Sequence, residues 1–135
     1  FGVLLPLTII AECLGVADHE LPTFKRWSDD FVAPIGNHAM SRDQLRSLLL
    51  SQNEFFVHFS KEVADRREAP REDLISDLVA ATIDDEPLRD DEILAMLSQF
   101  LVAGNETTTK LIASAVRLLI DWLWRGPPAA LLLRP

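Results

Sequence analysis

This sequence of 135 residues has no tyrosine, one cysteine and fewer basic than acidic residues. The single cysteine, Cys13, cannot form an internal disulfide, and no cysteine and histidine cluster has zinc-site spacing. A reducing cytoplasm is therefore the expected location. The 13 lysine and arginine residues are outnumbered by 21 aspartate and glutamate residues, giving a formal net charge of -8. Nucleic acids and anionic membranes are bound through clustered lysine and arginine, so neither is predicted as a partner.

Long apolar runs and strand patterns are also missing. No segment reaches the roughly 18 uninterrupted apolar residues that a membrane span requires. The apolar stretch 1–16 has no basic residues ahead of it and is interrupted by Pro6 and Glu12, so it is not predicted to be a signal peptide. No sustained period-two alternation is present, and no Asn-Gly or Asp-Gly pair marks a hairpin. The sequence thus predicts a soluble protein, and signals for strands are nearly absent.

Helical spacing of apolar residues occurs along the whole chain, and the predicted fold class is all-α. Ser41, with Gln44 three residues later, predicts a capping box at the start of a long amphipathic helix that ends before Pro70. The other helices are predicted over residues 7–14, 23–32, 73–83 and 90–120, and the acidic stretch 84–92 is expected to be a solvated linker running into the last helix. Side chains expected to face the core are Phe24, Trp27, Phe31, Leu45, Leu48, Leu49, Phe55, Phe56, Phe59, Val63, Leu74, Leu78 and Ala81.

The last helix carries a polar island, residues 104–110, between two apolar halves. A helix that is apolar on nearly all sides is expected to be buried in something larger. Glycine costs about 1 kcal/mol in a helix interior, and a buried carboxylate is expensive unless it is paired. Threonine hydroxyls can bond to carbonyls four residues earlier and bend the helix. The island therefore favours a helix locally widened beside a ligand. The alternative is an exposed face with a Glu106–Lys110 ion pair.

The hexapeptide Ala103-Gly104-Asn105-Glu106-Thr107-Thr108 resembles the central-helix signature of the cytochrome P450 family. That signature is a small residue, glycine, any residue, an acid, threonine, then threonine or serine. The resemblance includes Phe100, Leu101 and Val102 just before the hexapeptide. Upstream it extends, in the family's order, over residues 10–16, 24–28, 66–67 and 71–79. In all it covers the chain from residue 5 to about residue 120.

This resemblance implies that residues 1–121 are the central helical part of the mainly α cytochrome P450 fold, followed by a divergent Pro/Ala/Leu-rich tail, 122–135. In that part, the helix around Trp27 and the long helix after Ser41 would form the lid over the substrate, and the last helix would be the oxygen-activation helix. It implies a haem b cofactor, a small organic substrate, and electrons from a ferredoxin-type or flavin redox partner. The implied reaction is the insertion of one oxygen atom into the substrate. By similarity, Thr107 hydrogen-bonds the dioxygen being reduced and Glu106 relays protons. Ala103 and Gly104 leave room for the haem, and Thr108 supports the helix distortion beside it.

Several parts of the family pattern are absent from this sequence. Nothing matches the loop that carries the axial cysteine, so no metal ligand is predicted in this chain. Cys13 lies upstream of the central helix, whereas the ligand belongs downstream, and it is expected to be a small buried apolar residue. The Glu-x-x-Arg element is also missing. The chain alone is therefore expected to be inactive. The alternatives are a helical binding or scaffold module, or the non-functional product of a broken gene.

Overall fold

The computed structural model describes residues 4–35 and 39–125, except for the side chains of Asn105, Glu106 and Arg125. Within these residues the chain forms five α-helices, one short 3-10 turn and one two-stranded hairpin, which confirms the all-α prediction. The elements in chain order are α1 (Leu4–Cys13), η1 (Asp18–Glu20), α2 (Leu21–Val32), α3 (Arg42–Glu68), α4 (Leu74–Ala80), β1 (Thr82–Ile83), β2 (Glu86–Pro87) and α5 (Asp90–Arg125).

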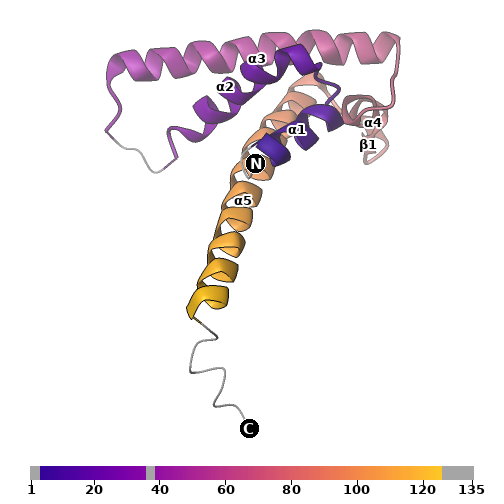
Figure 1. Ribbon diagram of the computed structural model, residues 1–135. Coiled ribbons are helices and arrows are strands. Elements are labelled where there is room, and N and C mark those ends of the chain that lie inside the picture. Colours follow the sequence, from indigo (N-terminus) through magenta and orange to yellow (C-terminus); the bar gives the residue numbers. More distant parts are fainter. Residues whose placement is uncertain (1–3, 36–38, 126–135) are drawn as a thin grey trace.

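The helices form two layers that cross each other (Figure 1). In one layer α2 lies along α3, and in the other α1 lies along α5. The second half of α5 extends away from the other helices. The core lies where the layers meet. Its buried apolar side chains are Leu7, Ala11, Leu14, Phe24, Trp27, Phe55, Phe59, Val63, Ile75, Leu88, Ile93, Leu97 and Leu101.

The helix ends follow the capping signals in the sequence. The backbone N–H of Ser41 donates to Gln44 Oε1 at 2.8 Å and that of Gln44 donates to Ser41 Oγ at 3.2 Å, which confirms the predicted capping box. After α1, Gly15 adopts a φ of +68°, which glycine tolerates without steric cost. The N–H of Val16 then reaches the carbonyl of Ala11 at 2.9 Å, closing a Schellman motif. These caps fix where α1 ends and α3 begins.

Aromatic rings join α2 to α3. The ring of Trp27 lies 5.7 Å from that of Phe55, nearly perpendicular to it, and Phe55 lies 4.6 Å from Phe59. The first pair is edge-to-face and the second is tilted, and aromatic pairs of these kinds add to the stabilisation from apolar burial. The prediction was wrong for Leu45, Leu49 and Phe56, which are exposed. They lie on the apolar stripe of α3, and α2 covers that stripe only in part. Phe56 still contacts Phe31 of α2, with 6.1 Å between the ring centroids.

The stretch after α4 is a hairpin, where the sequence suggested the end of a helix and a linker. β1 pairs antiparallel with β2, with Thr82 opposite Pro87 and Ile83 opposite Glu86. Asp84 and Asp85 form the turn with φ values of 53° and 65°. A two-residue turn with both residues in the left-handed region matches the twist of a hairpin, and aspartate tolerates that region better than most residues. Helix α4 therefore ends at Ala80, three residues before the predicted end.

Two neighbouring arginines at the end of α3 tie it to the elements that follow. Arg66, fully buried, donates from Nε to Asp73 Oδ2 at 2.9 Å and also bonds to Glu62. Arg67 donates from Nη2 to the carbonyl of Leu88 at 2.9 Å and to Asp90 Oδ1 at 2.7 Å. Arg67 thus holds the first residue of α5 against the end of α3.

Helix α5 continues to Arg125, five residues beyond the predicted end. The tail assigned to residues 122–135 therefore starts as helix, because the backbone hydrogen bonds of α5 continue past Asp121 until shortly before Gly126 and Pro127 in the sequence. Residues 126–135 lie outside the described part. None of the described helices is long and apolar enough to cross a membrane.

Candidate functional site on helix α5

The hexapeptide 103–108 lies in the middle of α5, and every residue of α5 is α-helical. The predicted local widening of the helix is therefore not present. The predicted back-bond is present, because the hydroxyl of Thr107 donates to the carbonyl of Ala103. This bond lies alongside the backbone ladder and does not interrupt it.

Consecutive residues of an α-helix point about 100° apart, so the residues of the hexapeptide point in different directions around α5. Ala103 and Thr107 are four positions apart and share one face, about 40° from each other. Gly104 and Thr108 share another face by the same geometry. The two faces have different surroundings.

The face of Ala103 opens into an apolar groove of about 470 Å³ on the first half of α5. The groove is lined by Glu92, Ala95, Met96, Gln99, Phe100 and Ala103. Phe100 is 43% exposed, so a large aromatic ring faces the open side of this groove. A surface of this kind is typical of a site that an apolar ligand covers.

The face of Gly104 is packed against α1. A β-carbon at position 104 would come within 2.8 Å of Ile10 Cδ1 and 3.4 Å of Ile10 Cγ1. The residues before it on this side of α5, Leu97 and Leu101, are fully buried. Gly104 therefore continues the packed stripe of α5. Whether its backbone also borders a haem stays a prediction.

The remaining predicted residues are Glu106, Thr107 and Thr108. The side chain of Glu106 lies outside the described residues. Thr107 and Thr108 are both exposed, which the alternative of an exposed polar face would also require. The apolar residues that follow favour the interpretation that α5 is normally covered by something larger. Leu111, Leu118 and Leu123 are 68%, 68% and 70% exposed. A helix whose natural surroundings were water would not carry so many large apolar side chains.

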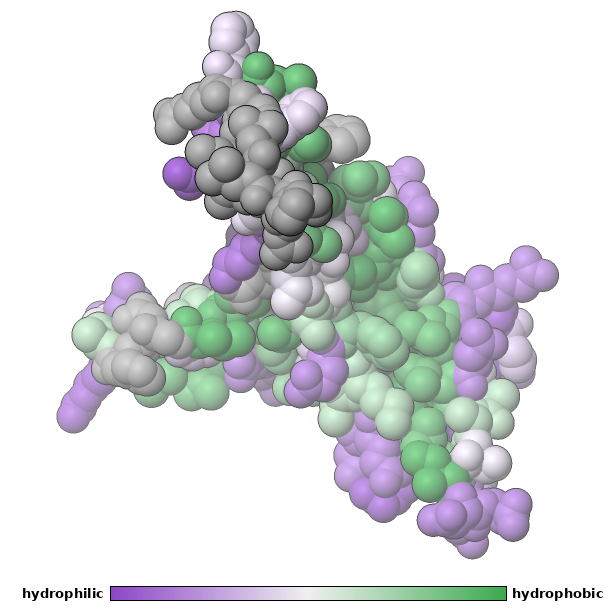
Figure 2. Space-filling model, turned by 90° about the horizontal axis from the view of Figure 1, so that it is seen from below, coloured by the Kyte–Doolittle hydropathy of each residue, from purple (hydrophilic) through white to green (hydrophobic). Residues whose placement is uncertain are grey.

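Apolar residues also dominate the molecule viewed from below (Figure 2). They form a broad surface across the middle of that view, and hydrophilic residues gather at its margins. Large exposed apolar side chains are contributed by three helices: Leu4, Leu5 and Ile9 of α1, Leu45, Leu49, Leu50, Phe56 and Val57 of α3, and Phe100, Leu111, Val116, Leu118, Leu119, Ile120, Trp122, Leu123 and Trp124 of α5.

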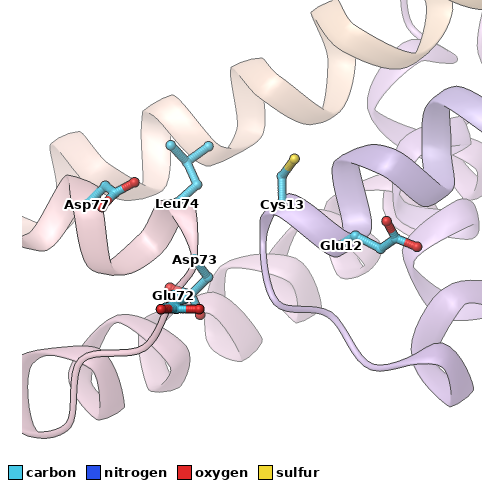
Figure 3. Close-up of a pocket in the computed structure, with 6 residues that line it drawn as sticks. All are labelled: Glu12, Cys13, Glu72, Asp73, Leu74 and Asp77. Atoms are coloured by element: carbon cyan, nitrogen blue, oxygen red, sulfur yellow. The ribbon is translucent and has the colours of Figure 1, made fainter.

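Cys13 is exposed, so its prediction as a buried apolar residue was wrong. Helix α1 buries Leu7 and Ala11, and Cys13 lies two positions after Ala11, on nearly the opposite side of the helix. Cys13 helps to line a groove of about 540 Å³ to which Glu72, Asp73 and Leu74 also contribute. Figure 3 shows its thiol pointing away from the side chains of Glu72 and Asp73. In the described part of the chain, no three histidine, cysteine or acidic side chains are grouped so that they could hold a metal ion.

Comparison with known proteins identifies the family. No family model matches the chain. A curated relative, cytochrome P450 109 of Bacillus spizizenii, is 36% identical over 121 residues, which are 87% of this chain and 29% of that protein. The solved structure of cytochrome P450 CYP109Q5 from Chondromyces apiculatus is 44% identical, with a TM-score of 0.76 over 92% of this chain and 29% of that one. CYP109E1 of Bacillus megaterium, solved in complex with testosterone, is 30% identical, with a TM-score of 0.77 over 90% of this chain and 31% of that one.

The chain belongs to the cytochrome P450 family. It spans about three-tenths of the length of these relatives, 29% to 31%. The structural match extends over both helical layers, so the predicted resemblance and the mainly α fold are confirmed.

Sequence reasoning missed the surroundings of the cytochrome P450 hexapeptide. Met96, Gln99 and Phe100 could have been placed beside Ala103, because they precede it by seven, four and three residues. Ile10 could not, since nothing in the sequence pairs α1 with Gly104.

Proposed function

We propose that this chain provides the oxygen-activation helix, α5, and the lid helices, α2 and α3, of a bacterial haem-thiolate monooxygenase. The observation that carries the proposal is the position of Ala103, whose small side chain lies at the end of an open apolar groove on the same face of α5 as Thr107. The proposed enzyme acts in the cytoplasm, takes electrons from a ferredoxin-type or flavin partner, and is inactive without the rest of the fold.

The residues present fit one side of a haem. Ala103 and Gly104 carry the smallest side chains of this part of α5, and Met96 and Phe100 give the adjoining surface the apolar character that a porphyrin or an apolar substrate covers. The axial cysteine is not among these residues, and Cys13, at the end of α1, is not proposed for that role. When bound, the haem supplies the reductive splitting of dioxygen. Thr108 and the backbone at Gly104 are proposed to border it.

Thr107 and Glu106 are proposed to handle protons. A threonine hydroxyl has one proton and two lone pairs. Because the hydroxyl of Thr107 donates its hydrogen bond to the carbonyl of Ala103, its lone pairs can accept a hydrogen bond from a water molecule on the groove side. Adjacent residues point about 100° apart on a regular helix, so a path through water is proposed to connect Glu106 with Thr107. Glu106 is thus assigned the resupply of protons. Thr107 is assigned the holding, through its lone pairs, of the water that carries a proton to the reaction centre.

The substrate is proposed to be a small apolar organic molecule. The groove beside Ala103 offers mainly methylene, thioether and aromatic surface from Met96, Phe100 and Ala95, with few polar groups. A related structure, that of CYP109E1, contains testosterone, which is a molecule of this character. The testosterone complex supports the class of substrate, and the particular substrate depends on residues outside this chain.

The test is a chimera in which residues 4–125 replace the matching segment of CYP109Q5, which provides the remaining parts of the fold. The unmodified CYP109Q5 is the control. We expect the chimera to bind haem and to give the red-shifted Soret band of a thiolate-ligated carbonyl complex. We also expect it to consume reductant in the presence of apolar substrates. A chimera that folds but does not take up haem would contradict the proposal. That result would favour a helical binding module, in which the exposed apolar surface alone would be the binding site.

A further inference from the structure

Ile10 of α1 packs against Gly104 of α5 where the two helices meet. The side chain of Ile10 fills the space in which a β-carbon at position 104 would lie, since Ile10 Cδ1 is only 2.8 Å from that point. Real β-carbons do not approach other atoms so closely, so a side chain at position 104 must turn the Cδ1 end of Ile10 into another rotamer or move α1. Ile10 itself is half-buried and packs against the core.

The contact lies at the turn of α5 that carries the hexapeptide. Ala103, one residue before Gly104, faces the apolar groove, and Thr107, three residues after it, bonds to Ala103. Along α5, Leu101 is the last side chain in the buried core, and beyond Gly104 most of the large apolar side chains are exposed. The contact with Ile10 therefore occurs where α5 leaves its packed surroundings.

We propose that Ile10 is a positioning residue for the hexapeptide: by seating in the space left by Gly104, it fixes the rotation and height of α5 at Ala103 and Thr107. The proposal rests on the proposed function for the role of these two residues, although the contact itself does not. It assigns a part in the reaction to a side chain on α1, outside the hexapeptide, and gives Gly104 a packing role as the receiving surface.

The first test is a mutational cycle in the 135-residue chain, read by hydrogen exchange of the amides in α1 and in residues 97–108. Gly104→Ala should lower their protection about fivefold or more, because overpacking outweighs the gain in helix propensity. Ile10→Val removes only Cδ1, the atom in closest contact. In that background Gly104→Ala should leave protection unchanged or raise it up to about fivefold, as expected for alanine over glycine in a helix.

The matched control is Ile9→Val, which removes the same methyl group from the neighbouring residue of α1, 51% exposed. In this background Gly104→Ala should still lower protection. Equal effects of Gly104→Ala in all three backgrounds would overturn the contact. The small size of the Ile10→Val change keeps the cycle informative even if Ile10→Ala fails to fold.

The second test uses the haem-loaded chimera and compares Ile10→Ala with Ile9→Ala at equal haem content. Ile10→Ala should raise the yield of hydrogen peroxide per reductant consumed, and Ile9→Ala should leave it unchanged. An unchanged yield in Ile10→Ala would limit Ile10 to packing and overturn its positioning role. A chimera without haem would instead overturn the proposed function, and the hydrogen-exchange cycle would still decide whether Ile10 and Gly104 are coupled.

Discussion

Arg66 and Asp73 form an almost completely buried ion pair, with side chains 0% and 5% exposed and a distance of 2.9 Å between Nε and Oδ2. Asp73 is also the N-cap of α4, where its Oδ1 accepts from the backbone N–H and the hydroxyl of Ser76. Gly15 lies against the same pair, since a β-carbon there would come within 2.8 Å of Asp73 Oδ2. One carboxylate thus links the end of α3 to the start of α4 and lies beside the glycine that follows α1.

The first prediction concerns the acid stability of this junction. Burial raises the pKa of Asp73, but the hydrogen bonds from Ser76 and Arg66 outweigh it and hold the pKa below its ordinary value. A lowered pKa in the folded state stabilises the fold above the unfolded-state pKa of about 4, and this stabilisation is lost as the pH falls through the folded-state pKa. Asp73→Asn should therefore cost about 3 kcal/mol at neutral pH. The loss should shrink below about pH 4 in urea unfolding. A pH-independent difference would contradict this assignment.

The hairpin turn gives a second prediction. Asp85 has a φ of 65°, a conformation that glycine adopts without the steric cost of a β-carbon. Asp85→Gly should raise the free energy of unfolding by about 0.5–1 kcal/mol. Glu86→Gly, one residue later in β2, should lower it, because glycine weakens an extended strand. Thermal unfolding of both variants measures this pair, and a loss of stability in Asp85→Gly would refute the turn geometry.

How much of the structure could be predicted differs between local and distant features. Capping at Ser41 and the end of α1 at Gly15 depend on residues within four positions, and the sequence was sufficient for both. The Asp84-Asp85 turn was missed because aspartate enters the left-handed region less often than glycine or asparagine, and the hairpin rules look for those residues first. In α3, periodicity identified the apolar stripe but not its coverage, because α2 covers only part of that long helix.

The hexapeptide could be located from the sequence alone, but its surroundings could not. The helical period divides Ala103 and Thr107 from Gly104 and Thr108 without any coordinates. Which face meets α1 and which opens into the groove depends on how the two helices cross, and that contact joins residues far apart in the chain. Because α1 is apolar at most positions, its sequence does not indicate that Ile10 rather than Ile9 faces α5.

The third prediction concerns self-association. The second half of α5 exposes large apolar side chains, including Leu111 and Leu118, each 68% exposed. The isolated chain should associate through this segment, because burying apolar surface is favourable in water. Leu111→Lys with Leu118→Lys should reduce the sedimenting mass toward that of a monomer. The matched change on α3, Leu49→Lys with Leu50→Lys, should have less effect. Equal effects would show that α5 is not the main contact.

The fourth prediction concerns Cys13. The 135-residue chain mixed with haem and carbon monoxide should not give the red-shifted Soret band of a thiolate complex, because Cys13 lies at the end of α1 in a groove beside Glu72 and Asp73. Cys13→Ser should leave the spectrum unchanged. A red-shifted band that appears with the unmodified chain and disappears in Cys13→Ser would show that Cys13 is a haem ligand. The haem would then bind at a site other than the one proposed beside Ala103.

The assignment of Thr107 and Glu106 is the central claim, and the hydrogen peroxide released per reductant consumed by the haem-loaded chimera tests it most directly. Thr107→Ala should keep haem and substrate binding but divert much of the reductant to hydrogen peroxide. Glu106→Ala should instead slow turnover, since a positioned proton donor is worth about 10²–10⁴-fold. Ser98→Ala is the matched control, because the Ser98 hydroxyl also bonds to a carbonyl of α5, that of Ala95 at 2.8 Å, outside the hexapeptide. A peroxide yield in Thr107→Ala equal to that in Ser98→Ala, with undiminished turnover in Glu106→Ala, would contradict the account.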